Sequence, residues 1–184
     1  MISREEAIKL LNEKVKAENM LKHCFASEAV LRAIARRLGK NEEEWGLAGL
    51  LHDIDVEITN ADPMTHGPYA EKILKGKVTE EILDAIMMHN EIATGKERVT
   101  EFQHALAAGE TITGLITATT LVYPDKKIAG VKPKSITKRM NQRAFAASVK
   151  RENILECEKI GIPLDEFSEL SLNAMKGISD KLGL

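Results

Sequence analysis

The sequence has few aromatic residues, only two cysteines and no long uncharged apolar run. Aromatic residues make up 4% of the chain, whereas Ala, Leu, Ile, Glu and Lys dominate, and this composition favours helices over a β-sandwich or β-barrel. Cys24 and Cys157 lie far apart in helix-like segments, which predicts reduced core residues of a cytoplasmic protein. A disulfide framework and a thiolate metal site are thereby disfavoured.

The chain also lacks the segments that direct a protein to or across a membrane. No apolar run approaches the ~20 residues that a membrane helix needs. The first residues do not combine a basic region with an apolar one, so no signal peptide is predicted. The formal net charge is −2, which predicts no general affinity for nucleic acid or anionic membranes. We therefore expect a cytoplasmic protein without a membrane partner.

Capping patterns and apolar spacing predict an all-α fold. Ser3 with Glu6 and Thr100 with Gln103 are capping-box pairs, and Pro63 suits a first helical turn, which would put His66 early in a helix. Loops are expected over 54–62 and 90–99. The expected helices cover 3–16, 19–38, 41–52, 63–76, 79–89, 100–122, a short helix capped by Ser135, 142–150, 153–160 (capped by Asn153) and 163–182.

These elements predict a compact multi-helix bundle of eight to ten helices with no strand. No internal boundary is evident, so residues 1–184 are expected to form a single domain. Within it, residues 20–122 would be a core and residues 123–184 a C-terminal helical extension packed on that core.

Metal-ligating side chains occupy positions that are predicted to be buried. His52 and Asp53 end the apolar run 47–51, and burying such a pair is costly unless a metal ion or another partner compensates it. His23 and His89 each share a helix face with apolar residues. A lone histidine on such a face is more often a hydrogen-bonded core residue than a ligand, so the prediction depends on the complete set.

Glu110 is an unusual glutamate because small residues surround it on its helix. Thr113, Gly114 and Thr117 follow it at helical spacing and would leave room for a ligand or a metal. Histidine and carboxylate donors without thiolate suit Fe, Mn, Mg, Ni, Co or Zn, and the residues alone do not distinguish among these ions. His104 lies outside the set and is predicted to be structural or exposed.

The order His23, His52-Asp53 and Glu110 resembles the HD-domain superfamily of metal-dependent phosphohydrolases, whose signature is His, His-Asp, Asp. The resemblance covers about residues 20–122, which would be the HD-type metal-binding core, and the tail is similar to that of HDIG-like hydrolases. It implies that His23, His52, Asp53 and Glu110 hold one metal ion. His66 and His89 look like the two extra histidines of two-metal members, so Asp53 would bridge two ions.

The resemblance implies an enzyme that hydrolyses a small phosphate ester or anhydride, with a nucleotide as the expected substrate. A metal-bound water or hydroxide would attack phosphorus, which needs no side-chain nucleophile. Asp53 and Asp55 are the predicted catalytic residues, although Asp55 could instead cap the acidic loop. Divalent ions, expected as a pair, are the predicted cofactors, and association with further copies of the chain is left open.

Residues 126–143 hold seven basic residues and no acidic one. Such a run is most often a solvated face, but close to a phosphate site Lys126, Lys134 and Arg139 would be candidates for binding substrate phosphate. Binding of nucleic acid through the run is disfavoured by the net charge and by the lack of interleaved aromatic residues.

One departure from the family pattern leaves a second hypothesis open. The late ligand position expects Asp, but Glu110 stands there, and its carboxylate reaches one methylene further. A displaced first metal ion would make the chain a catalytically weak HD-fold module that binds a nucleotide or another anion and has a regulatory role.

Overall fold

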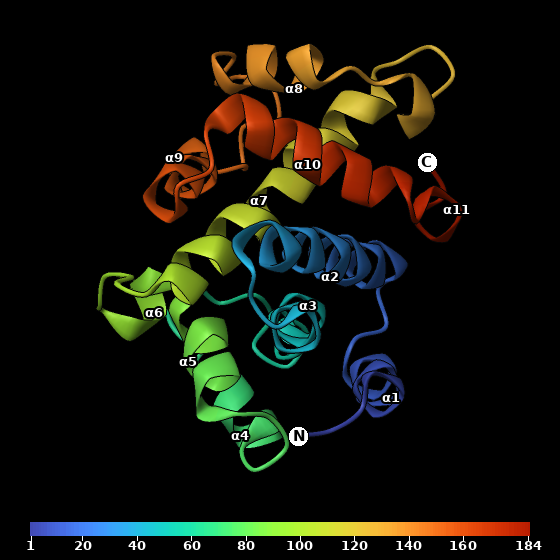
Figure 1. Cartoon of the computed structure of the whole chain (residues 1–184). Helices are drawn as coiled ribbons and strands as arrows, with labels where there is room; N and C mark the ends of the chain where they lie inside the picture. Colours follow the sequence, from blue (N-terminus) through green and yellow to red (C-terminus); the bar gives the residue numbers. More distant parts are fainter.

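The computed structural model describes residues 1–184 and contains α-helices and short 3-10 helices but no strand, which confirms the predicted all-α fold (Figure 1). Eleven α-helices are present, one more than the upper bound of the prediction. The elements are α1 (Arg4–Lys14), α2 (Glu18–Leu38), α3 (Glu42–Leu51), α4 (Ala70–Leu74), α5 (Glu80–Met88), α6 (Glu91–Thr94), α7 (Glu101–Leu121), η1 (Ile128–Gly130), α8 (Pro133–Met140), α9 (Arg151–Leu155), η2 (Glu156–Ile160), α10 (Leu164–Lys176) and α11 (Ser179–Leu182).

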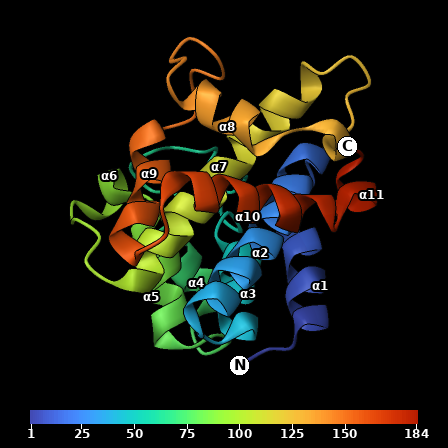
Figure 2. The same ribbon diagram turned by 45° about the horizontal axis from the view of Figure 1, so that its top comes forward.

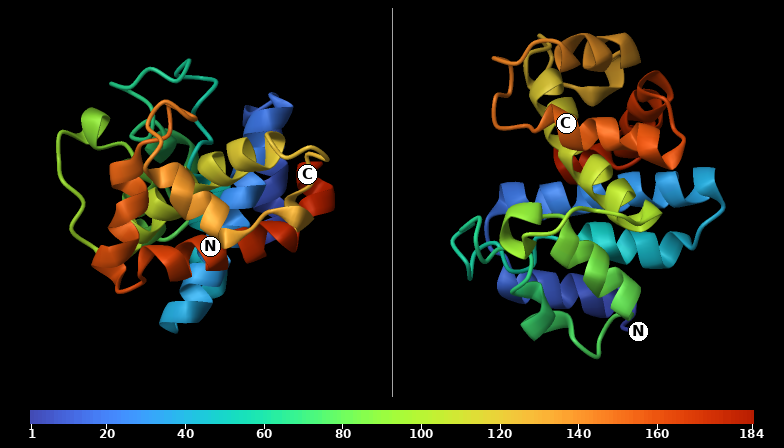
Figure 3. Two further views of the ribbon diagram at one scale, coloured as in Figure 1. Left: turned by 90° about the horizontal axis from the view of Figure 1, so that it is seen from above. Right: turned by 90° about the vertical axis from the view of Figure 1, so that its left-hand side faces the viewer.

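The two longest helices, α2 and α7, pack together across the middle of the molecule. Helices α1, α3, α4 and α5 lie on one side of this pair, and α8, α9 and α10 lie on the other (Figures 1 and 3). One hydrophobic core of 41 residues contains side chains from Ala7 in α1 to Leu182 in α11. This continuity supports the proposal that the chain is one domain with its C-terminal helices packed on the core.

None of the helices combines the length and the apolar character needed to cross a membrane.

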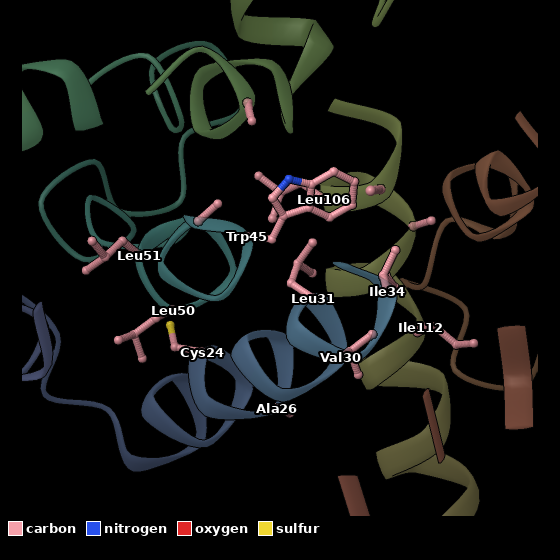
Figure 4. Close-up of a cluster of buried hydrophobic side chains, with 14 of the residues drawn as sticks. Cys24, Ala26, Val30, Leu31, Ile34, Trp45, Leu50, Leu51, Leu106 and Ile112 are labelled. Atoms are coloured by element: carbon pink, nitrogen blue, oxygen red, sulfur yellow. The ribbon is translucent and has the colours of Figure 1, made fainter. Parts of the chain in front are cut away.

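Apolar side chains such as Leu31 and Leu50 fill the space between α2, α3 and α7 (Figure 4), and two glycines allow α3 and α7 to approach α2 closely. A Cβ atom on Gly49 of α3 would lie 2.6 Å from the carbonyl oxygen of Ser27 in α2, and one on Gly109 of α7 would lie 2.5 Å from Leu31 Cδ2. A side chain on Gly49 would force α3 away from the backbone of α2, whereas one on Gly109 would have to displace the side-chain ends of Leu31 and Ile34. The histidine of α2 and the polar residues that follow these glycines are thereby brought close together.

The predicted caps explain several helix boundaries. Both capping boxes form, since the side chains of Ser3 and Thr100 accept hydrogen bonds from the third residue of their helices and the glutamate or glutamine there caps in return. The Thr79 side chain accepts from the Ile82 N–H group at the start of α5, without a return cap, and Gly39 ends α2 in a left-handed conformation (φ +66°). Cys24 and Cys157 are free and buried, as predicted.

The prediction that His66 lies early in a helix is wrong, because residues 56–69 form turns and α4 begins only at Ala70. Gly67 adopts a positive φ of 96°, and its N–H group donates to the carboxylate of Asp55 instead of to a helical carbonyl. Pro68 follows, and proline disfavours the helical conformation of the residue before it. The segment that contains His66 therefore forms turns and not the first turns of a helix.

The other errors lie mainly in the C-terminal third. Residues 142–150 form turns instead of a helix, and Asn153 lies inside α9 rather than capping it. The helix predicted to begin with Ser135 as its cap starts two residues earlier, at Pro133, which occupies the first helical position. The last predicted helix is broken after Lys176, and the loop 90–99 contains the short α6.

Candidate metal centre

Four histidines and an aspartate from different parts of the chain meet beside α7. His23 lies on α2, His52 and Asp53 directly follow α3, His66 lies in the turns before α4, and His89 ends α5. His52 and Asp53 are buried, and the other three side chains are half-buried. We call these five residues the donor cluster.

The Nε2 atoms of the donor cluster converge on the carboxylate of Asp53. Asp53 Oδ2 lies 3.5 Å from His23 Nε2 and 3.3 Å from His52 Nε2. Its second oxygen, Oδ1, lies 3.1 Å from His66 Nε2 and 3.6 Å from His89 Nε2. The structure thus contains two adjacent groups of three donors, each suited to a metal ion, and the groups share Asp53.

The Nδ1 atom of each histidine is hydrogen-bonded away from the centre. The acceptors are the Gly49 carbonyl for His52 (2.9 Å), the Ile86 carbonyl for His89 (2.5 Å), the Thr113 hydroxyl for His23 (2.9 Å) and the Asp55 carboxylate for His66 (2.8 Å). Carbonyl and carboxylate oxygens only accept hydrogen bonds, so the proton is on Nδ1. The Thr113 hydroxyl donates to the Glu110 carbonyl (2.7 Å), which leaves its oxygen free to accept from His23.

With Nδ1 protonated, each Nε2 offers a lone pair to the centre, as metal-binding histidines do. The rings lie in two facing pairs, since His23 Nε2 is 3.1 Å from His52 Nε2 and His66 Nε2 is 3.1 Å from His89 Nε2. Two lone pairs at this distance repel each other unless a proton or a metal cation lies between them. The donor set therefore fits divalent cations.

The electrostatics show how the cluster is balanced when no metal ion is bound. Burial lowers the pKa of His23 and of His89 to about 4, so both are neutral at pH 7. Burial also disfavours the charged forms of His52 and His66, but the nearby carboxylates outweigh it: the pKa of His52 is raised, and that of His66 is raised to about 10. At pH 7 His66 therefore carries a second proton, which a metal ion would have to displace.

The carboxylate of Asp53 remains ionised within this cluster. Burial alone would raise the pKa of Asp53, but His52, His66 and His23 hold it well below its usual range. A carboxylate that stays charged in a buried site is a strong ligand for a divalent cation.

Glu110 lies at the edge of the donor cluster. Its Oε2 atom is 3.8 Å from His23 Nε2, and its Oε1 atom accepts a hydrogen bond from the Thr111 hydroxyl. Burial raises the pKa of Glu110 to about 7. The structure therefore brings Glu110 to the same wall as His23 but outside the two compact groups of donors.

Asp55 and Asn90 hold His66 in place. Asp55 is fully buried, accepts from His66 Nδ1 and from the Gly67 N–H group (2.8 Å), and does not line the cavity at the centre. Asn90 donates its amide to the carbonyls of Pro63 (2.9 Å) and His66 (2.8 Å). This geometry favours a positioning role for Asp55 over the predicted catalytic one.

A cavity of about 360 Å³ opens onto the donor cluster. His23, Asp53, His66, His89 and Glu110 form its inner end, and its outer walls come from two loops, 56–69 and 141–150. Both loops lie on the same side of α7 when the molecule is seen from above (Figure 3, left). A second cavity, of about 470 Å³, adjoins the first and shares His23 and Gly114 with it.

The basic residues predicted to bind phosphate do not line this cavity. Lys134 lines a separate groove, and Arg139 donates to the side chain of Gln142 and lies over the ring of Phe145. Lys126 lines neither of the cavities that border the donor cluster. None of these three residues therefore lines the cavities at the donor cluster, and their role in binding phosphate stays a prediction. Lys150 is the lysine that lines the cavity. The sequence did not single it out, because a helix was expected over residues 142–150.

A second buried polar group, which the sequence did not reveal, lies behind His89. Arg98 donates to the carboxylate of Glu156 (2.7 Å) and to the carbonyls of Met88 and His89 (both 3.1 Å). His104 donates from Nδ1 to the same carboxylate (2.7 Å). We call Arg98, His104 and Glu156 the arginine cluster. His104 is thus buried and structural, one of the two outcomes predicted for it.

Comparison with known proteins gives one match. A family model described as the HD domain matches residues 20–123, which is more than half of the chain. No curated protein and no solved structure matches the chain significantly.

Proposed function

The chain belongs to the HD-domain superfamily of metal-dependent phosphohydrolases, and from this membership we propose that it hydrolyses a small phosphate ester or anhydride at the donor cluster. The observation that carries the proposal is the position of Asp53, whose two oxygens face different histidine pairs. His23, His52 and Asp53 would hold one divalent cation, with Glu110 beside it, and Asp53, His66 and His89 would hold the other.

Two bound divalent cations would supply charge neutralisation at the phosphoryl oxygens and a water of lowered pKa. In the reaction a water oxygen forms a bond to phosphorus, and the bond from phosphorus to the leaving oxygen breaks. The products are phosphate and an alcohol, or two phosphorylated products when the substrate is an anhydride. The chain orients the ligands through the hydrogen bonds from Nδ1 and keeps Asp53 ionised for both cations.

The second cavity supports a nucleotide as the substrate. Its volume of about 470 Å³ lies in the range typical of small-molecule sites, roughly 300–1,000 Å³. It adjoins the donor cluster at His23, and Ala118, Leu121 and Leu182 contribute apolar walls. A nucleoside could occupy it while the phosphate lies at the metal centre.

The test combines metal analysis with a phosphatase screen. The purified chain is analysed for bound metal and assayed with Mn²⁺, Co²⁺, Ni²⁺, Mg²⁺, Zn²⁺ and Fe²⁺ on nucleotides and on p-nitrophenyl phosphate. We expect Asp53→Ala to lose bound metal and to lower turnover at least about 1,000-fold, more than 4 kcal/mol in the barrier. Asp125→Ala, an exposed aspartate outside both cavities, is the matched control. Full metal-dependent turnover by Asp53→Ala would refute the proposal.

The position of Glu110 favours one rival function, a binding module with a weakened first metal site. The carboxylate of Glu110 lies 3.8 Å from His23 Nε2 and accepts a hydrogen bond from Thr111. Glu110→Asp distinguishes the two functions, because aspartate is the residue that the family pattern expects there. Hydrolysis that appears only in Glu110→Asp would favour the binding module, whereas turnover by the natural chain would exclude it.

A further inference from the structure

Residues 141–150, which we call the cavity loop, form one wall of the cavity without any regular secondary structure. The loop joins α8 to α9 and projects beyond both (Figure 2). Ser148, Val149 and Lys150 at its end line the cavity together with the donor cluster. A loop that is mostly exposed is nevertheless fixed in one conformation at a candidate active site.

Arg151 fixes this conformation by binding the main chain of the loop. Its Nη1 atom donates to the carbonyls of Ala146 (2.7 Å) and Val149 (2.8 Å). Its Nη2 atom donates to the carbonyl of Phe145 (2.5 Å) and is also within hydrogen-bonding distance of the carbonyls of Gln142 and Arg139. Three of these carbonyls, those of Arg139, Gln142 and Ala146, also accept from main-chain N–H groups three residues further on, so the loop forms successive turns instead of the predicted helix.

Arg139 forms a second clamp at the start of the loop. Its guanidinium lies 4.0 Å from the ring centre of Phe145 and donates to Gln142 Oε1 (2.9 Å). Ala146 adopts a positive φ of 45°, a conformation that is unfavourable for a residue with a Cβ atom. Ordering a loop costs conformational entropy, and the contacts of these two arginines offset that cost.

The ordered loop places a free cation at the cavity. Lys150 is the one lysine or arginine among the lining residues, which also include the carboxyl groups of Asp53 and Glu110. Lys150 forms no ion pair with them, and its side chain is exposed. The hydroxyl of Ser148 and the amide of Asn153 line the cavity beside it. An ammonium group and two neutral donors on one wall suit the oxygens of a phosphate group.

We propose that the cavity loop is a preformed phosphate-binding element, in which Lys150, with Ser148 beside it, binds the phosphate group of the substrate and Arg151 positions both. The inference rests on the proposed function, because it places the bound phosphate between the loop and the metal centre. Lys150 is a binding residue, whereas Arg151 is a positioning residue that acts through the loop.

The first experiment measures binding of inorganic phosphate to the Mn²⁺-loaded chain by isothermal titration calorimetry. We expect Lys150→Gln to weaken phosphate binding at least about tenfold while its metal content stays unchanged, and Lys150→Arg to retain most of the affinity. With p-nitrophenyl phosphate, Lys150→Gln should raise KM by a similar factor and leave kcat nearly unchanged, as loss of uniform binding does. Lys9→Gln, at an exposed lysine outside both cavities, is the matched control.

The second experiment tests the positioning role by a double-mutant cycle. Arg151→Lys keeps the charge but cannot bind several carbonyls with a planar fork. We expect it to weaken phosphate binding about as much as Lys150→Gln, and the double variant to be no weaker than either single variant. Cleavage of residues 141–150 by a protease should become faster in Arg151→Lys, while the remainder of the chain stays resistant.

The outcomes separate this inference from the proposed function. Unchanged phosphate affinity and unchanged KM in Lys150→Gln, with metal bound and turnover intact, would overturn the inference alone. Additive effects in the double variant would overturn the positioning role of Arg151. A natural chain that binds no metal and hydrolyses nothing would overturn the proposed function, and phosphate affinity that nevertheless depends on Lys150 would keep the loop as an anion site.

Discussion

The donor cluster and the arginine cluster both combine histidine with carboxylate, and they meet at His89, whose carbonyl accepts a hydrogen bond from Arg98. In the arginine cluster the permanent positive charge of Arg98 faces the carboxylate of Glu156, and His104 donates to the same carboxylate. In the donor cluster four imidazoles surround a single carboxylate, and two pairs of Nε2 atoms face each other. In the arginine cluster the donors and acceptors pair with each other, whereas the donor cluster needs added protons or cations between its Nε2 atoms.

The contrast teaches that the composition of a buried polar group does not reveal its role. What distinguishes the two clusters is whether donors and acceptors within the protein balance each other. The arginine cluster is balanced, and it joins the end of α5 to the start of η2. The donor cluster has more lone pairs than protons to bind them, and this excess of acceptors suits a positively charged ligand.

The largest effect that would sharpen this comparison is expected at Glu156. Glu156→Ala removes the buried carboxylate partner of Arg98 and leaves only the more exposed carboxylate of Glu91, 3.2 Å away. Breaking a buried ion pair in this way costs about 3–5 kcal/mol. We expect urea denaturation to show a loss of this size in the metal-free chain. Glu158→Ala, an exposed neighbour, is the control. The comparison would be broken if Asp53→Ala destabilised the metal-free chain more than Glu156→Ala does.

A smaller effect is expected at Thr113, which holds one ring of the donor cluster. Thr113→Val keeps the shape but removes the acceptor for His23 Nδ1, and losing such a partner typically weakens metal affinity about 10–100-fold. Competition with a chelating dye would measure the affinity. Thr119→Val is a matched control, because the Thr119 hydroxyl is buried on the same helix and bonds only to the carbonyl of Leu115. Equal effects of the two variants would refute the role of Thr113.

The smallest effect concerns pH and the arginine cluster. Burial would raise the pKa of Glu156, but the hydrogen bonds from Arg98 and His104 outweigh it and lower the pKa below its usual 4.5. A carboxyl group with a lowered pKa in the folded state stabilises the protein fully above the pKa of the unfolded state, and this stability is lost as the pH falls through the folded pKa. We expect the stability difference between the natural chain and Glu156→Gln to shrink as the pH drops below about 4.5. Urea titrations at several pH values would measure it, and a constant difference would contradict the assignment.

The sequence predicted the elements that depend on local signals. Capping pairs such as Ser3 with Glu6 and apolar spacing along the chain gave helix boundaries close to those observed. The residues of the donor cluster were also found, because their order along the chain matches the family pattern and the structure brings them together. Their role as metal ligands stays a prediction until metal is measured.

The sequence did not predict contacts between residues that are far apart in the chain. His104 and Glu156 are separated by 52 positions, and no periodic pattern relates them. Lys150 was missed because a helix was expected over residues 142–150, whereas the structure has turns there whose carbonyls also bind the side chain of Arg151. The hydroxyl of Thr113 was noticed only as a small neighbour of Glu110, and its bond to His23 depends on how α7 crosses α2.

Gly49 determines more than the contact between two helices. Its carbonyl accepts the hydrogen bond of His52 Nδ1, and its missing side chain lets α3 lie against the backbone of α2, which carries His23. The distance between the two facing rings is therefore set by backbone packing and not by the flexible ends of long side chains. The candidate metal centre is therefore as rigid as the hydrophobic core beneath it. The size of the ion that it accepts would be determined by the packing of α3 on α2, at Gly49, which is not itself a ligand.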